Sequence, residues 1–147
     1  MMTQTRPTEL HQRRILMTRN AAAAGEARSQ VRLVIRAWEV PVDPDIAILL
    51  TSELVTNAIS HEAGETITLA VTCSFGQLRV DVHDTSRTLP VLADAPADAE
   101  AGRGLMLVAT LSATWGIYRT PAGKAVYFTL AFEPDPSGDG RAQTWGL

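Results

Sequence analysis

Two polar side chains, Glu53 and Asn57, stand one helical turn apart inside an otherwise apolar run at positions 46–59. At about 100° per residue, a helix over this run places them on one stripe with His61, and apolar residues occupy the opposite side. Such a helix must be largely covered by the rest of the protein. Burying an unpaired amide costs roughly 2 to 7 kcal/mol, depending on the reference state. These groups therefore pair internally as a satisfied polar cluster, lie at a partly exposed edge of the helix, or face a ligand.

A third polar residue, Asp84, ends an expected strand and opens the sequence Asp84-Thr85-Ser86. An aspartate at a strand end, followed by turn-forming residues, is well placed to accept a hydrogen bond from a ligand amine. The alternative is an ordinary turn residue.

A glycine-containing segment follows at positions 102–105 and opens an expected helix. Glycines let the backbone approach a ligand closely, and a helix start offers unpaired N–H groups suited to phosphate. The arginine inside the segment could add a charge-assisted contact. Alternatively, the glycines only punctuate a loop, because a lone Gly-x-Gly is a weak signal. The four residues are Gly102, Arg103, Gly104 and Leu105.

The elements that must position these residues follow from hydrophobic periodicity. Helical spacing predicts helices from the alanines at 21–24 to about Val40, from Asp43 or Pro44 to before Gly64, and from Leu105 to about Leu111. Alternation predicts strands over 14–18, 66–74, 77–83, 113–119 and 124–132.

The order of these elements indicates an α+β fold, with a single sheet covered on one face by helices. We expect one domain over residues 14–132, preceded by a flexible leader at 1–13. A mobile loop is expected over 91–102 and a disordered tail over 133–147.

Composition narrows the classes of function. The chain has 147 residues, 46% of them hydrophobic and 20% charged, which is ordinary for one soluble domain. A formal charge of -3 offers no basic field for nucleic acid. No apolar stretch approaches the ~20 residues of a membrane helix. The single cysteine, Cys73, lies in an apolar alternating stretch and predicts a small buried hydrophobe in a reducing, cytoplasmic compartment.

The order and spacing of the three signals resemble the GHKL superfamily, whose ATP-binding fold is shared by gyrase, a heat-shock chaperone, histidine kinases and MutL. Residues 53–57, with His61 a turn later, look like its N box. Residues 84–86 look like its G1 box, and residues 102–105 look like its G2 box. The resemblance covers roughly residues 14–132. It implies a two-layer α/β sandwich, the Bergerat ATP-binding fold, with a mixed, mostly antiparallel sheet and about three helices.

Within the superfamily, the chain is most similar to stand-alone, histidine-kinase-like ATP-binding proteins of actinobacteria, related to the anti-sigma factor serine kinases. The segments at 52–58 and 102–105, Trp115-Gly116, and Gly123-Lys124 are typical of that group.

The resemblance implies a role for each site residue, with ATP and Mg²⁺ as cofactors. Asn57 would offer its amide oxygen to Mg²⁺, a hard cation that prefers oxygen ligands. Glu53 would be the general base on the attacking hydroxyl, or would orient a water, during γ-phosphoryl transfer. Asp84 would accept a hydrogen bond from the adenine amino group. Residues 91–102 would form the ATP lid. The remaining nucleotide-binding residues would be His61, which could instead be a structural residue at the helix end, and Ser86, Gly102, Arg103, Gly104 and Leu105.

The chain also departs from the wider superfamily. Ser86 stands where many members have glycine, and Lys124 and Ala125 stand where many place a threonine near the adenine. A histidine kinase would also need a phosphoacceptor helix pair, for which the chain has no room.

The leading hypothesis is an ATP- and Mg²⁺-dependent protein serine/threonine kinase that acts as an anti-sigma factor. By resemblance, its partners would be a sigma factor, which it sequesters, and a STAS-type antagonist, which it phosphorylates. A homodimer is what the relatives suggest. One alternative is a nucleotide-regulated binding module without kinase activity. Another is a degenerate fold that binds no nucleotide.

Overall fold

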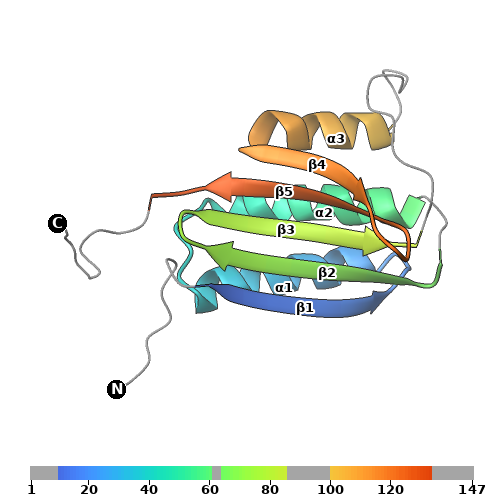
Figure 1. Ribbon diagram of the computed structural model, residues 1–147, viewed down its shortest axis with the longest axis horizontal. Coiled ribbons are helices and arrows are strands. Elements are labelled where there is room, and N and C mark those ends of the chain that lie inside the picture. Colours follow the sequence, from blue (N-terminus) through green and yellow to red (C-terminus); the bar gives the residue numbers. More distant parts are fainter. Residues whose placement is uncertain (1–9, 61–63, 86–99, 134–147) are drawn as a thin grey trace.

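The computed structural model describes residues 10–60, 64–85 and 100–133. Five strands form one sheet, and three helices accompany it (Figure 1). The strands are β1 (His11–Thr18), β2 (Thr66–Ser74), β3 (Gln77–Asp84), β4 (Thr114–Arg119) and β5 (Lys124–Ala131), and the helices are α1 (Ala23–Ala37), α2 (Pro44–Ser60) and α3 (Glu100–Leu111).

The sheet has the strand order β1-β2-β3-β5-β4, and all of its pairings are antiparallel. The β2–β3 hairpin turns at Phe75 and Gly76, where Gly76 has a φ of 80°. Because glycine adopts a positive φ without steric cost, this turn is compact. The register of β3 and β5 places Asp84 directly opposite Lys124.

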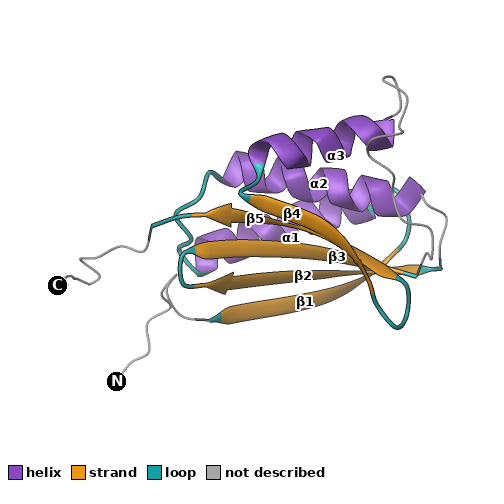
Figure 2. Cartoon of the chain, turned by 45° about the horizontal axis from the view of Figure 1, so that its top comes forward, coloured by secondary structure: helices purple, strands orange, loops and turns teal. Residues whose placement is uncertain are grey.

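All three helices lie on one face of the sheet, as Figure 2 shows. The central helix is α2, which packs against α1, α3, β3 and β5. Alternate residues of the inner strands meet this layer, since successive strand side chains point to opposite faces. The core between the layers is built from residues such as Leu50, Leu54, Ile67, Leu69, Val80 and Phe128. The expected α+β two-layer sandwich is therefore confirmed, with the difference that the described sheet is antiparallel throughout rather than mixed.

Two boundaries near the N-terminus differ from the expectation. The strand β1 begins at His11 rather than Arg14, because its polar first residues pair with β2 at the sheet edge, where exposed side chains are tolerated. The helix α1 ends at Ala37 rather than near Val40. Glu39, at a φ of 55°, follows it, and the Val40 N–H donates to the Ile35 carbonyl at 3.0 Å. This is a Schellman-type helix end, closed here by a glutamate in the position that glycine usually takes.

The helix α3 begins at Glu100, five residues before the expected Leu105. Gly102 and Gly104 therefore lie inside the helix rather than before it. Each glycine in a helix interior costs about 1 kcal/mol relative to alanine. The segment up to residue 102 is also rich in Ala, Asp, Pro and Glu and shows no periodicity, so the sequence predicts a loop there. Packing of α3 against α2 and β4 overrides this local preference.

Candidate functional site

The polar stripe of α2 is half covered by the fold. Glu53 is half-buried, and Asn57 retains only 4% of its exposed surface. Their neighbours on the same helix, Leu50 and Leu54, are in the core. The expectation that this helix is covered on more than one side is confirmed, because Val55 on its opposite side is buried as well.

The side-chain amide of Asn57 is the clearest anomaly in the described part of the chain. Both Oδ1 and Nδ2 are buried, and neither has a hydrogen-bond partner. The Ser60 hydroxyl donates to the backbone carbonyl of Asn57 at 2.9 Å and does not reach the side-chain amide. A buried unsatisfied polar group costs about 1 to 3 kcal/mol. Asn57 is therefore not part of a satisfied internal cluster, and its two amide atoms match a ligand that supplies both a cation and an acceptor.

The start of α3 lies over this stripe at Gly104. A Cβ built on Gly104 would stand 2.6 Å from Oε1 of Glu53, so the missing side chain leaves the space that the carboxylate occupies. Gly104 itself is buried, whereas the side chain of Leu105 belongs to the hydrophobic core. The N box and the G2 box are thus in contact through one glutamate and one glycine.

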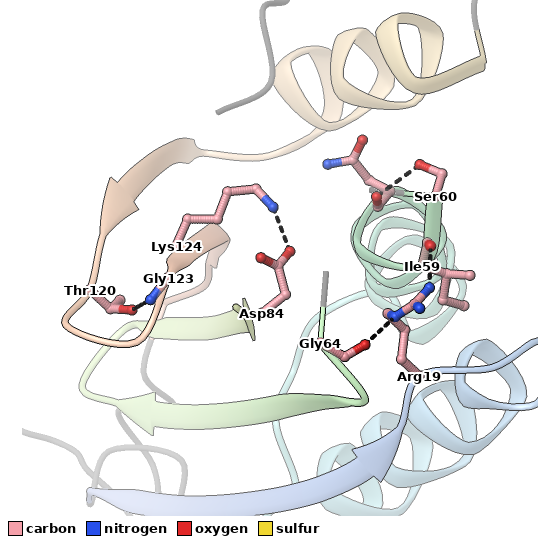
Figure 3. A network of polar contacts seen from close by, with 9 residues as sticks. Arg19, Ile59, Ser60, Gly64, Asp84, Thr120, Gly123 and Lys124 are labelled. Atoms are coloured by element: carbon pink, nitrogen blue, oxygen red, sulfur yellow. Dashed lines mark hydrogen bonds and ion pairs between the residues drawn. The ribbon is translucent and has the colours of Figure 1, made fainter. Parts of the chain in front are cut away.

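Asp84 is the last residue of β3, as expected, and it forms a buried ion pair with Lys124 of β5. The Lys124 Nζ lies 2.5 Å from Asp84 Oδ2, and the two side chains are 0% and 2% exposed. Figure 3 shows the lysine extended toward the carboxylate, to the left of α2 in this view. Asp84 is therefore more than a turn residue.

Two glycines, Gly64 and Gly123, lie in close contact with the chain at Asp84 and Thr85. A Cβ on Gly64 would clash with the Thr85 hydroxyl, and a Cβ on Gly123 would clash with the Asp84 carbonyl. Gly64 also has a φ of 68°, which favours glycine. The turn that carries Asp84 is thus held between the start of β2 and the β4–β5 turn, where Gly123 donates to the Thr120 hydroxyl (Figure 3).

Arg19 fixes the far end of α2. Its guanidinium donates to the Ile59 carbonyl at 3.0 Å and to the Gly64 carbonyl at 2.7 Å (Figure 3). The last carbonyls of a helix lack intrahelical donors and carry a partial negative charge, so a cation here is favourable. Arg19 thereby holds the helix end that follows Asn57.

A separate polar group lies on the sheet face away from the helices. The Arg79 guanidinium pairs with both oxygens of Asp81, at 2.9 and 3.0 Å, and stacks 3.9 Å from the Tyr127 ring centre. The Tyr118 hydroxyl donates to Asp81 at 2.7 Å. Burial, together with this hydrogen bond, raises the pKa of Tyr118, and burial lowers the pKa of His83 nearby. These partners satisfy one another, so we read this group as structural.

Several predicted site residues cannot be placed. His61, Ser86 and positions 91–99 lie outside the described residues. Gly102 and Arg103 belong to α3, but their side chains are also outside the description. The residue that the sequence analysis did not assign to the site is Lys124. It belongs to the Gly123-Lys124 segment, and the antiparallel pairing of β3 with β5 is the signal that brings Lys124 to Asp84.

Comparison with known proteins decides the family. The model of the histidine kinase-like ATPase domain matches residues 17–130, which is most of the chain. The protein belongs to the histidine kinase-like ATPase family. This agrees with the superfamily expected from the three boxes and gives the site its coarse function, the binding of ATP. No curated protein matches the chain significantly.

Among the described residues, no three His, Cys, Asp or Glu side chains cluster in a way that could hold a metal ion. In nucleotide sites Mg²⁺ is commonly held by one or two protein oxygens together with the substrate phosphates. The unpaired buried oxygen of Asn57 fits such a ligand. None of the described helices is long and apolar enough to cross a membrane.

Proposed function

We propose that this histidine kinase-like ATPase domain is an Mg²⁺-dependent protein serine/threonine kinase that regulates transcription as an anti-sigma factor. The observation that carries the nucleotide half of the proposal is the buried Asn57 amide without a partner. A protein keeps such a group when a ligand satisfies it, because otherwise the group only destabilises the fold.

Each residue of the site would have a different role in phosphoryl transfer. Bound Mg²⁺ would supply positive charge against the phosphates, and Asn57 would hold it through Oδ1. The Asn57 amide N–H groups are donors and would contact a phosphate oxygen. Glu53 lies one turn away, half-buried against Gly104, and would accept the proton of the attacking hydroxyl. Asp84 would accept a hydrogen from the adenine amine.

The partners follow from the resemblance to anti-sigma factor kinases. The hydroxyl would come from a serine or threonine of a small STAS-type antagonist, and a sigma factor would be held while the antagonist is phosphorylated. Asn57 would serve a binding module equally well, whereas Glu53 matters only if the phosphoryl group is transferred. The alternative of a nucleotide-regulated binding module therefore predicts nucleotide binding without transfer.

The test is phosphoryl transfer from labelled ATP to candidate STAS antagonists. We expect the wild-type protein to transfer label. Glu53→Gln should transfer it at least roughly 100-fold more slowly, since general-base catalysis contributes a factor of about 10²–10⁴ to the rate. The matched control is Glu26→Gln, at an exposed glutamate of α1, which should transfer normally. Transfer by Glu53→Gln at the wild-type rate would remove Glu53 as the base. Nucleotide binding by the wild type with no transfer to any antagonist would favour the binding module.

A further inference from the structure

Lys124 is the only lysine in the chain, and the other 12 of its 13 lysine and arginine residues are arginines. It is also among the largest fully buried side chains of the described residues, with 0% of its surface exposed. A lysine is almost never fully buried unless it is paired. The position of this residue therefore requires a specific explanation.

The pairing of Lys124 is incomplete. An ammonium group carries three N–H donors. Among the described residues, its Nζ has a single acceptor, the Asp84 carboxylate. Two donors of a buried cation are then left over at the end of β3. Buried donors in native proteins are normally satisfied by protein, water or ligand.

The ion pair places a donor beside an acceptor, and because the two side chains are 0% and 2% exposed, a nucleotide must uncover them to reach either group. Asp84 supplies carboxylate oxygens, and the Lys124 ammonium lies 2.5 Å from one of them. Adenine has the complementary pattern on one edge, where the exocyclic amine is a donor and the adjacent ring nitrogen, N1, is an acceptor. In guanine the same two positions are reversed, because O6 accepts and N1–H donates. The pair at β3 and β5 therefore matches adenine on two points.

We propose that Lys124 is a specificity-determining residue that donates a hydrogen bond to N1 of the adenine while Asp84 accepts from the amine. This inference rests on the proposed ATP site and adds a second contact to the base. Lys124 also stays paired with Asp84 and so holds the Asp84 carboxylate in place. The competing account is that Lys124 blocks Asp84 and that nucleotide must displace it.

The direct test compares ATP with 1-deaza-ATP, in which a C–H replaces N1 and the amine is kept. The wild-type protein should bind 1-deaza-ATP roughly 10- to 100-fold more weakly, the range for a hydrogen bond to a charged group. Equal affinities for the two nucleotides would overturn the inference and leave the ATP site intact. Failure to bind either nucleotide would instead overturn the proposed function together with the inference.

Two variants distinguish direct contact between Lys124 and the base from blocking of Asp84 by Lys124. Lys124→Met removes all donors, and Lys124→Thr keeps a hydroxyl that can serve Asp84 if the methionine variant does not fold. Either variant should bind ATP more weakly than the wild type, and Lys124→Met should no longer distinguish ATP from 1-deaza-ATP. Tighter binding of ATP by both variants would show that the lysine competes with the nucleotide, and would overturn the proposal.

A matched nucleotide isolates Asp84 from Lys124. Purine riboside triphosphate keeps N1 and lacks the amine, so both the wild type and the Lys124 variants should bind it more weakly than ATP. Because Lys124 is the only lysine, protein labelled with ¹⁵N-lysine gives a single Nζ resonance. This resonance should shift with ATP and with purine riboside triphosphate, and much less with 1-deaza-ATP. An unchanged resonance on saturation with ATP would contradict direct contact.

Discussion

Gly104 of α3 lies directly against the carboxylate of Glu53 in α2, with a Cβ at position 104 falling 2.6 Å from Oε1. This relationship joins two boxes that are about 50 residues apart in the sequence. Glycine is required at position 104 for a reason other than backbone freedom, because this residue lies inside a helix. The reason is space for the side chain of the expected general base.

The first prediction concerns this contact. In Gly104→Ala, the new methyl group would displace the end of the Glu53 side chain, which is flexible, so the fold should survive. Alanine also favours the helix by about 1 kcal/mol. We expect phosphoryl transfer, or slow ATP hydrolysis, to fall at least tenfold while the free energy of unfolding stays equal or rises.

Gly25→Ala is the matched control, because Gly25 lies in α1 and a Cβ there would make only an ordinary contact with Arg28, at 3.5 Å. It should show the same gain in helix stability with unchanged activity. Full activity in Gly104→Ala would show that the position of the Glu53 carboxylate is unimportant.

The second prediction concerns stability at Asn57. Replacing its unpaired amide with an apolar group of similar size, in Asn57→Leu, should raise the free energy of unfolding of the ligand-free protein by about 1 to 3 kcal/mol. Chemical denaturation measures this. The other asparagine, Asn20, is a control of opposite sign, since its Oδ1 accepts from the Ala22 N–H at 2.9 Å. Asn20→Leu should destabilise. Equal destabilisation by both substitutions would mean that the Asn57 amide is satisfied in solution.

The third prediction concerns the end of α2. Arg19→Ala removes one hydrogen bond to the Ile59 carbonyl in the last turn of α2 and one to the Gly64 carbonyl before β2, and should lower the free energy of unfolding by roughly 1 to 3 kcal/mol. Amide hydrogen exchange should also speed up in the last turn of α2. Arg13→Ala, which breaks an exposed bond to Gln30, should change stability by less than about 0.5 kcal/mol. Similar losses in both variants would deny Arg19 a special role.

The fourth prediction concerns pH. Burial raises the pKa of the Cys73 thiol from 9.0 to about 11. A raised pKa means that the folded state holds the proton more tightly, so its contribution is complete below about pH 9 and is lost as the pH rises to 11. The loss is roughly 2 to 3 kcal/mol. The difference in unfolding free energy between the wild type and Cys73→Val should shrink or invert over this range. A constant difference from pH 8 to 11 would contradict the shift.

Much of the fold follows from local patterns. The apolar run of α2 and the alternation of β2 and β3 are long and regular, so their type and ends were predicted closely. The strand end at Asp84 was found for the same reason. Local signals failed where tertiary contacts decide. The edge strand β1 starts among polar residues, and α3 incorporates two glycines because it packs on α2.

The site was predictable only in part. The spacing of Glu53 and Asn57 placed them on one face of a helix, but whether Asn57 is satisfied depends on neighbours from other elements. The Asp84–Lys124 pair depends on β3 and β5 being adjacent, although 40 residues separate them in the chain. The Glu53–Gly104 contact similarly requires the packing of two helices. Local spacing therefore identifies the side chains of the site, whereas their contacts depend on residues distant in the chain.

The central claim is that the fold keeps the Asn57 amide unpaired for Mg-ATP. Calorimetric titration of Mg-ATP into the wild type and Asn57→Leu tests it most directly. The wild type should bind Mg-ATP and should bind ATP more weakly when Mg²⁺ is chelated. Asn57→Leu should lose at least about tenfold in affinity, or 1.4 kcal/mol, and should no longer respond to Mg²⁺. Binding of Mg-ATP by Asn57→Leu with the wild-type affinity, or no binding by the wild type, would contradict the account.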